Sequence, residues 1–199
     1  MLSDIYRVGF IGHREINNVI DVENKLYPII QDLIKHKEFV EFYLGRNGEF
    51  DVIAASVIRR VKKDIRSENS VMILVLPYSV ADMEDYINYY DEIVIPEELF
   101  GVHYKSAIKK RNEWLVDKSD LLISFIEREK GGAYQCVAYA NKKNKAVKNI
   151  AVVCNTKRLT IHRIIGIDNA PKIMRILTDQ SKIENEFRSR KSALRCLKD

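Results

Sequence analysis

Short runs of β-forming residues alternate with longer amphipathic segments through the first three quarters of this 199-residue chain. The run VMILVL, residues 71–76, is continuously apolar and suits a strand that is covered on both faces. Alternating strands and helices are typical of a parallel, doubly wound sheet, and right-handed crossovers then place helices on both faces of it. The sequence predicts an α/β fold of this kind, with strands over residues 5–11, 39–44, 71–76 and 121–126 and helices over 17–36, 51–63, 104–117 and 133–143.

Weaker patterns complete the prediction. An acidic, tyrosine-rich stretch fits a short helix near residues 82–89 and a short strand near 92–95. The run IAVVC, residues 150–154, is predicted to be the last strand of the sheet. The segment KRLTIHRIIGI could add an edge strand, and the sequence after it is typical of amphipathic helices. We therefore expect one domain over residues 1–154 and a basic, mainly helical extension over residues 155–199.

Composition excludes several classes of protein. No run reaches the roughly 18 apolar residues that a membrane-spanning helix needs, and the first residues make a poor signal peptide. We expect a cytoplasmic protein without a membrane partner. The three cysteines are widely spaced and form no CxxC pair, and the four histidines show no metal-ligand spacing. The sequence predicts neither a metal site nor a bound cofactor.

Charge is unevenly distributed along the chain. Of the 33 Lys and Arg and 28 Asp and Glu residues, the segment 155–199 holds 11 and 5, which leaves 22 and 23 for residues 1–154. The extension therefore carries a net charge of +6 and the preceding domain a net charge of −1. Such a basic extension could bind nucleic acid or an acidic partner, or it could be a solvated helix that keeps the protein soluble.

Glycine occurs in three turns that we expect at the carboxyl ends of strands. The turns are GFIGHRE, with Gly12, His13 and Arg14; GRNGEFD, with Gly45, Arg46 and Gly48; and EKGGAYQ, with Gly131 and Gly132. In an open α/β sheet ligands bind at this edge, where glycine permits close approach and helix N-termini favour anions. The turns match neither the dinucleotide fingerprint nor the P-loop, and each could be only a tight turn. Together with Arg14, Arg46 and Arg111, they predict an anion site.

The order of several motifs resembles a known group of proteins. The segments GFIGHR, YLGRNGEFDVIAASVIRRVK, VLPY and YKSAIKKRNEWLVDKSDLLISFIEREKGGAYQCVAYANKKNK are similar to those of the SLOG superfamily, which joins the Smf/DprA proteins to the LOG nucleotide hydrolases. The likeness covers roughly residues 5–153 and is greatest to small bacterial and phage members. It implies a Rossmann-like fold that binds a nucleotide or a nucleotide-derived ligand at the glycine turns. Some members hydrolyse nucleoside monophosphates, others sense nucleotide signals in conflict between bacteria and phage, and DprA members bind single-stranded DNA.

The LOG turn PGGxGTxxE can be compared with this chain residue by residue. Gly131 and Gly132 match its paired glycines, and Arg111 matches the arginine that precedes the turn. Tyr134 stands where the motif has its third glycine, and Gln135 where it has threonine. The catalytic glutamate of the motif falls near Val137 or Ala138, neither of which can act as an acid or a base. The resemblance therefore implies a binding site with only part of the hydrolase machinery.

Other residues near the turns are candidates for ligand contacts. Glu49 could supply the carboxylate that N-glycoside cleavage requires, with Arg111 beside it, or it could simply place a charge at a helix start. Tyr134 could stack on a base or ribose, and His13 could reach a phosphate. The amides of Asn112 and Gln135 are suited to hydrogen bonds with ribose or base.

These observations lead to one expected function and two alternatives. We expect a nucleotide-binding or nucleotide-sensing protein, with a small-molecule nucleotide as its ligand. The first alternative is an enzyme that releases the base from a nucleoside monophosphate. The second is DprA-like binding of nucleic acid through the basic extension. Folds of this kind commonly associate, so we also expect a homo-oligomer.

Overall fold

The six strands form a single parallel sheet with the order β4-β3-β2-β1-β5-β6. The structure is a computed structural model that describes residues 4–66, 68–80 and 83–151. The first three strands and β5 lie close to their predicted positions. The strands are β1 (Ile5–Gly12), β2 (Phe39–Leu44), β3 (Ser70–Val75), β4 (Glu92–Val94), β5 (Leu121–Phe125) and β6 (Ala146–Asn149).

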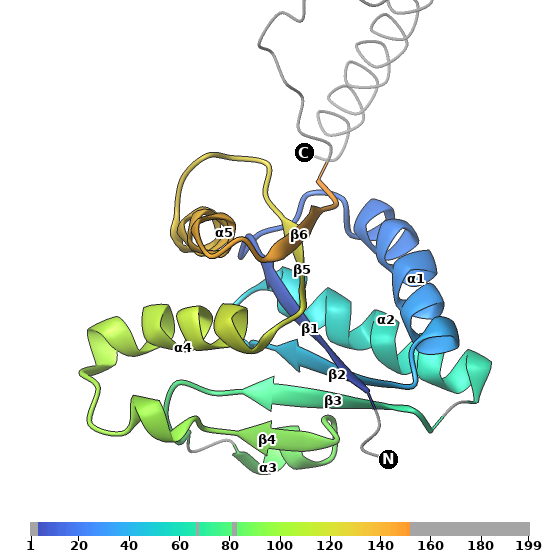
Figure 1. The fold of residues 1–199 in the computed structure, drawn as a ribbon, viewed down its shortest axis with the longest axis horizontal. Helices are drawn as coiled ribbons and strands as arrows, with labels where there is room; N and C mark the ends of the chain where they lie inside the picture. Colours follow the sequence, from blue (N-terminus) through green and yellow to red (C-terminus); the bar gives the residue numbers. More distant parts are fainter. Residues whose placement is uncertain (1–3, 67, 81–82, 152–199) are drawn as a thin grey trace, which may run out of the picture. The chain divides into compact units, whose positions relative to one another are not determined.

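Helices cover both faces of this sheet, as the alternating pattern predicts (Figure 1). The first is capped by Asn18, whose side-chain oxygen accepts a hydrogen bond from the Asp21 N–H at 3.2 Å. The helices are α1 (Val19–His36), α2 (Glu49–Ile65), the short α3 (Met83–Ile87), the 3-10 turn η1 (Glu97–Leu99), α4 (Tyr104–Lys118) and α5 (Gly132–Lys142). The protein thus has the doubly wound, Rossmann-like α/β fold.

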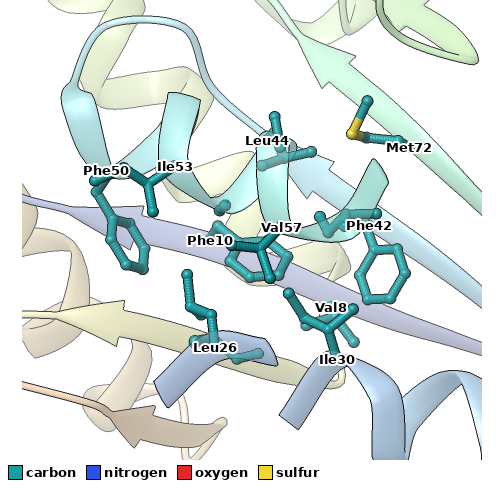
Figure 2. Close-up of a cluster of buried hydrophobic side chains, with 14 of the residues drawn as sticks. Val8, Phe10, Leu26, Ile30, Phe42, Leu44, Phe50, Ile53, Val57 and Met72 are labelled. Carbon is teal, nitrogen blue, oxygen red and sulfur yellow. The ribbon is translucent and has the colours of Figure 1, made fainter. Parts of the chain in front are cut away.

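Two hydrophobic layers hold the sheet between its helices. Alternate residues of β1 point to opposite faces, so Phe10 packs towards α1 and α2 whereas Ile11 packs towards α4 and α5. The first layer is the larger, and Figure 2 shows its centre, where Phe10 and Phe42 meet side chains of both covering helices. On the other face, a Cβ atom on Gly9 would lie 2.4 Å from Leu115 Cδ2, so the missing side chain lets α4 lie close to the sheet.

The last strand lies earlier in the chain than the sequence indicates. The prediction of a strand that begins at residue 150 is wrong, because β6 (Ala146–Asn149) pairs with β5 and ends there. Ile150 and Ala151 are buried, and the Ile150 N–H donates to the Ser124 carbonyl at 2.8 Å, so this apolar segment continues inward from the strand end. An edge strand can be polar, whereas Ile150 and Ala151 are apolar because they are buried. Residues 152–154 and the predicted extension lie outside the described residues.

Candidate functional site

The carboxyl ends of β1 and β5 mark the point where the strand order reverses. The chain proceeds outward from β1 through β2 and β3 to β4, and then returns to place β5 on the other side of β1 (Figure 1). In open α/β sheets, ligands bind in the crevice outside this point. A cavity of about 520 Å³ lies there, a size within the usual range for small-molecule sites. It is lined by Ile11, Gly12, His13, Arg14, Asn47, Gly48, Asp51, Ile108, Arg111, Asn112, Arg128, Lys130, Gly131, Gly132 and Ala133.

Residues from all three glycine turns line this crevice, although they lie far apart in the sequence. Of the site residues named from the sequence, eight are in the lining: Gly12, His13, Arg14, Gly48, Arg111, Asn112, Gly131 and Gly132. Aromatic side chains are tightly packed beneath Gly12. A Cβ atom on Gly12 would lie 2.3 Å from Phe50 Cγ, and the Phe50 ring stacks on the Phe125 ring with centroids 6.0 Å apart.

Five of the named residues lie outside the lining. Gly45 is buried behind Arg111, Tyr134 is half-buried, and Gln135 faces a neighbouring groove between α4 and α5. Arg46 donates a hydrogen bond to the Tyr86 hydroxyl at 2.9 Å. Glu49, the predicted catalytic carboxylate, accepts a hydrogen bond from the Ile16 N–H at 2.6 Å. That carboxylate therefore holds the loop after β1 instead of lining the crevice.

A buried arginine and a buried aspartate form one wall of the crevice. Arg111 is 3% exposed and Asp51 is 9% exposed. Both side chains lie against Gly45, where an added Cβ would come within 2.3 Å of Arg111 Nη1 and 2.8 Å of Asp51 Oδ2. Only glycine leaves room for both charged groups at this position. Within the described part of the chain, Arg111 Nε has no hydrogen-bond partner, which is unusual for a buried donor.

Asp51 occupies the backbone donors of the turn before α2. It accepts a hydrogen bond from the Asn47 N–H at 3.2 Å, and the backbone of Gly45 and Gly48 donates to it as well. Burial raises the pKa of Asp51, while the positive charge of Arg111 and these backbone donors oppose that rise. Burial likewise lowers the pKa of Arg111, and the charge of Asp51 opposes that change. The start of α2 is thus neutralised by a carboxylate of its own helix.

Among the described residues, the start of α5 has no such partner. Its N-cap is Gly131, with φ 92° and ψ 177°, a conformation that is essentially restricted to glycine, and no side chain caps the helix. The first N–H groups of α5 and the partial positive charge of its N-terminus therefore remain available for an anion. Arg128 and Lys130, which are both exposed, line the crevice just before this helix start.

His13 fixes the loop that carries these two cations. Its side chain is 8% exposed, and its Nε2 accepts hydrogen bonds from the backbone N–H groups of Glu127 at 3.0 Å and Arg128 at 3.3 Å. An imidazole that accepts at Nε2 is neutral and carries its proton on Nδ1. Burial lowers the pKa of His13, and the nearby charge of Arg128 lowers it further, although Glu127 acts in the opposite direction. His13 therefore connects the end of β1 to the loop after β5.

Four polar residues of the lining were not predicted as ligand-binding residues. Asn47, Asp51, Arg128 and Lys130 were not selected from the sequence. The one available signal was the charge pattern EREK directly before the glycine pair. Neither a metal cluster nor a membrane helix emerges from the parts of the chain that the structure covers. Within those parts, no three His, Cys, Asp or Glu side chains are grouped as metal ligands, and no helix has the length and apolar character to cross a bilayer.

Known structures share this fold. The chain superposes on DNA processing protein A (DprA) from Streptococcus pneumoniae with a TM-score of 0.53 at 14% identity, covering 72% of this chain and 49% of that one. For DprA from Helicobacter pylori, whose structure concerns single-stranded DNA binding, the TM-score is 0.50 at 16% identity, with coverage of 71% and 63%. The chain thus spans about half of the first protein and less than two thirds of the second.

One sequence relative is also similar. The SPbeta prophage-derived protein YoqJ of Bacillus subtilis is 24% identical, over 62% of this chain and 82% of YoqJ. No protein-family model matches the sequence. Fold and crevice define a Rossmann-like protein whose fold is similar to that of DprA, and this is consistent with the SLOG resemblance of the motifs.

Proposed function

We propose that the protein binds a nucleotide or a nucleotide-derived ligand in the crevice at the carboxyl ends of β1 and β5. The phosphate lies against the uncapped start of α5, where Gly131 and Gly132 let the ligand approach the backbone closely. The base and ribose extend towards Asn112 on α4, whose amide can both donate and accept hydrogen bonds. The protein acts as a binding or sensing module.

One observation carries this proposal: cations from two separate loops and one helix line a single cavity. Arg14, Arg111, Arg128 and Lys130 are there, against one carboxylate, that of Asp51. Asp51 lies beside Arg111, so the other three cations are left for a ligand that carries more than one negative charge. A phosphate meets this requirement, and a guanidinium can bind it through two hydrogen bonds.

A thermal-shift screen of the full-length protein tests the proposal. A nucleotide present at about 100 times its dissociation constant should stabilise the protein by about 2.7 kcal/mol, which raises the melting temperature by roughly 5–10 °C for a chain of this size. The screen should cover mononucleotides, dinucleotides and cyclic forms at low ionic strength, where charge–charge attraction is strongest. If none of these ligands raised the melting temperature, the proposed function would be ruled out.

Matched variants locate the site. Lys130→Ala should weaken nucleotide binding by about tenfold or more, because the free energy of one hydrogen bond to a charged group corresponds to a factor of about that size in affinity. Lys63→Ala is the control, since Lys63 is an exposed lysine of α2 outside the crevice lining. If the two variants lost affinity equally, the nucleotide would be held by general charge and not by this crevice.

Hydrolysis of the N-glycosidic bond is a second candidate function, and Asp51 is the observation that favours it. This carboxylate lines the crevice, and its pKa is raised by burial, as is common for groups that exchange protons during catalysis. It replaces Glu49 as the candidate acid or base, because Glu49 is bound to the Ile16 N–H. Incubation with nucleoside monophosphates should then release free base, and Asp51→Asn should abolish the release. Intact nucleotides after prolonged incubation would eliminate this alternative.

Binding of nucleic acid through residues 155–199 remains a hypothesis based on charge. The Helicobacter pylori DprA structure concerns single-stranded DNA binding, and the extension of this chain carries a net charge of +6. Phosphate contacts would make such binding steeply dependent on salt. Deletion of residues 181–199 should weaken it strongly, and a shortened protein that held single-stranded DNA unchanged would refute the idea. The expected homo-oligomer also remains a prediction, which light scattering can test.

A further inference from the structure

A second cavity adjoins the crevice and lies between helices α4 and α5. Its volume is about 650 Å³, and Ile108, Asn112 and Gly132 line both cavities. We call it the α4–α5 groove, and its remaining lining residues are Lys105, Lys109, Glu113, Gln135, Cys136, Ala138, Tyr139 and Lys142. Each cavity alone falls in the usual size range for a small-molecule site, so one mononucleotide would leave the other unused.

The passage between the two cavities is open at Gly132. A Cβ atom built on this glycine meets no heavy atom within 4 Å in the part of the chain that the structure describes, so no side chain of that part closes the junction at this point. Asn112 lies on the opposite wall, and its buried side-chain oxygen has no hydrogen-bond partner among the described residues. An orphan acceptor of this kind at a junction is suited to a hydroxyl or amino group of a bound molecule.

The chemistry of the groove matches another anionic unit. Residues three and four positions apart along two facing helices usually form an apolar seam. Here the positions on α4 include Lys105 and Lys109, and those on α5 include Gln135 and Lys142. The one carboxylate of the lining, Glu113, lies 3.9 Å from Lys109 and 3.1 Å from Lys110, which lies outside the groove. Lys105 and Lys142 therefore give the groove a net positive charge.

The groove also has apolar walls that suit a ring. Ile108, Cys136 and Ala138 line it, together with Tyr139. The Tyr139 hydroxyl donates to Asp117 Oδ2 at 2.9 Å, which holds the ring in place at the groove wall. The apolar walls can hold a planar ring, and the lysines of the same groove can bind a phosphate beside that ring.

We infer that the α4–α5 groove is a second subsite and that the ligand of the protein is a small dinucleotide, two nucleoside units joined through phosphate. This inference rests on the proposed function. One unit occupies the crevice, the linking phosphates cross the start of α5 at Gly132, and the second unit lies between α4 and α5 near Lys105 and Lys142. Gln135, which the sequence analysis named as a ligand contact, then serves the second unit and not the first.

Calorimetric titration of the full-length protein tests this inference with four kinds of probe. These are the monophosphates of adenosine and guanosine, the matching 5′–5′ diphosphate-linked dinucleotides, a 5′-phosphorylated deoxydinucleotide, and a single-stranded deoxyoligonucleotide of about ten residues. A dinucleotide with two 5′–5′ linked units should bind roughly tenfold or more tightly than its monophosphate, the gain expected from one further charge-assisted contact. The double variant Lys105→Ala/Lys142→Ala should remove this gain and leave monophosphate binding unchanged.

The control is Lys118→Ala, because Lys118 is an exposed lysine of the same helix that lines neither cavity. Equal affinities of the dinucleotide and the monophosphate in the wild-type protein would overturn the second subsite while the proposed function stood. Equal losses for both ligands in the double variant would do the same. If the oligonucleotide bound much more tightly than every dinucleotide, the groove would be a track for a nucleic-acid strand and the small dinucleotide would be wrong. Failure of all probes to bind would instead remove the proposed function itself.

Discussion

Replacing Arg111 with methionine should destabilise the protein strongly, because it leaves the Asp51 carboxylate buried without its positive partner. Both side chains lie against Gly45 inside the crevice wall, and they are only 3% and 9% exposed. Removing one member of a buried ion pair typically costs about 3–5 kcal/mol. Asp51 keeps its backbone donors, which favours the lower end, about 3 kcal/mol. For a chain of this size the melting temperature should fall by roughly 6–12 °C.

The pH dependence of this loss identifies its cause. Burial already raises the pKa of Asp51, and without Arg111 that pKa should rise further. A carboxyl group whose pKa is higher in the folded than in the unfolded protein adds stability when it is protonated. This stability is fully present below the unfolded pKa of about 3.9 and is lost as the pH rises through the folded pKa. The loss in the Arg111→Met variant should therefore be largest at neutral pH and become smaller in acid.

Urea denaturation of four proteins measures the effect: the wild type, Arg111→Met, Asp51→Asn and the double variant. Asparagine keeps an oxygen that accepts from the backbone donors but removes the charge, so the double variant should recover much of the lost stability. A change below about 1 kcal/mol for Arg111→Met, or additive losses in the double variant, would refute the argument, since uncoupled sites add.

Four further substitutions test other parts of the site. Gly12→Ala should cost about 1–3 kcal/mol by urea denaturation because its Cβ would overlap the buried Phe50 ring, whereas Gly132→Ala, which faces open space, should change stability by less than about 0.5 kcal/mol. Gly131→Ala should lower the free energy of unfolding by about 1–3 kcal/mol, because alanine is strained at φ 92°. An unchanged free energy of unfolding would mean that the backbone at the start of α5 relaxes freely. The pKa of His13 is lowered, so the stability that His13 contributes should be present above about pH 6.5 and lost as the pH falls. Glutamine keeps a hydrogen-bond acceptor but does not titrate. His13→Gln should therefore abolish this fall of the melting temperature in acid.

The sheet could be predicted from the sequence because its order of elements is encoded locally. Runs such as residues 39–44 and 71–76 are apolar enough to be recognised one at a time, and β2 and β3 lie there. The last strand was misplaced because β6 is a polar edge strand, whereas the apolar residues Ile150 and Ala151, which directly follow it, are buried. Burial and strand pairing depend on tertiary contacts, which local composition does not report.

The candidate site could be predicted at the level of its turns but not of its side chains. Glycine and sheet topology are sufficient to bring Gly12, Gly48 and Gly131 to one crevice. The choice between Glu49 and Asp51 depends on where α2 begins. Each helical residue turns by about 100°, so carboxylates two positions apart point to nearly opposite sides. Because α2 begins at Glu49 and not at residue 51, Glu49 points to the loop after β1 and Asp51 points to Arg111.

Backbone amide chemical shifts, followed during a nucleotide titration, test whether the three glycine turns form one nucleotide site. The protein would be labelled with ¹⁵N and titrated with adenosine or guanosine monophosphate and then with the corresponding dinucleotides. We expect the amide signals of Gly12, Gly48, Gly131 and Gly132 to shift together and to reach saturation at the same ligand concentration, because one bound anion contacts all three turns. Shifts confined to other surfaces, or glycine amides that saturate at different concentrations, would contradict the claim that these turns form a single nucleotide site.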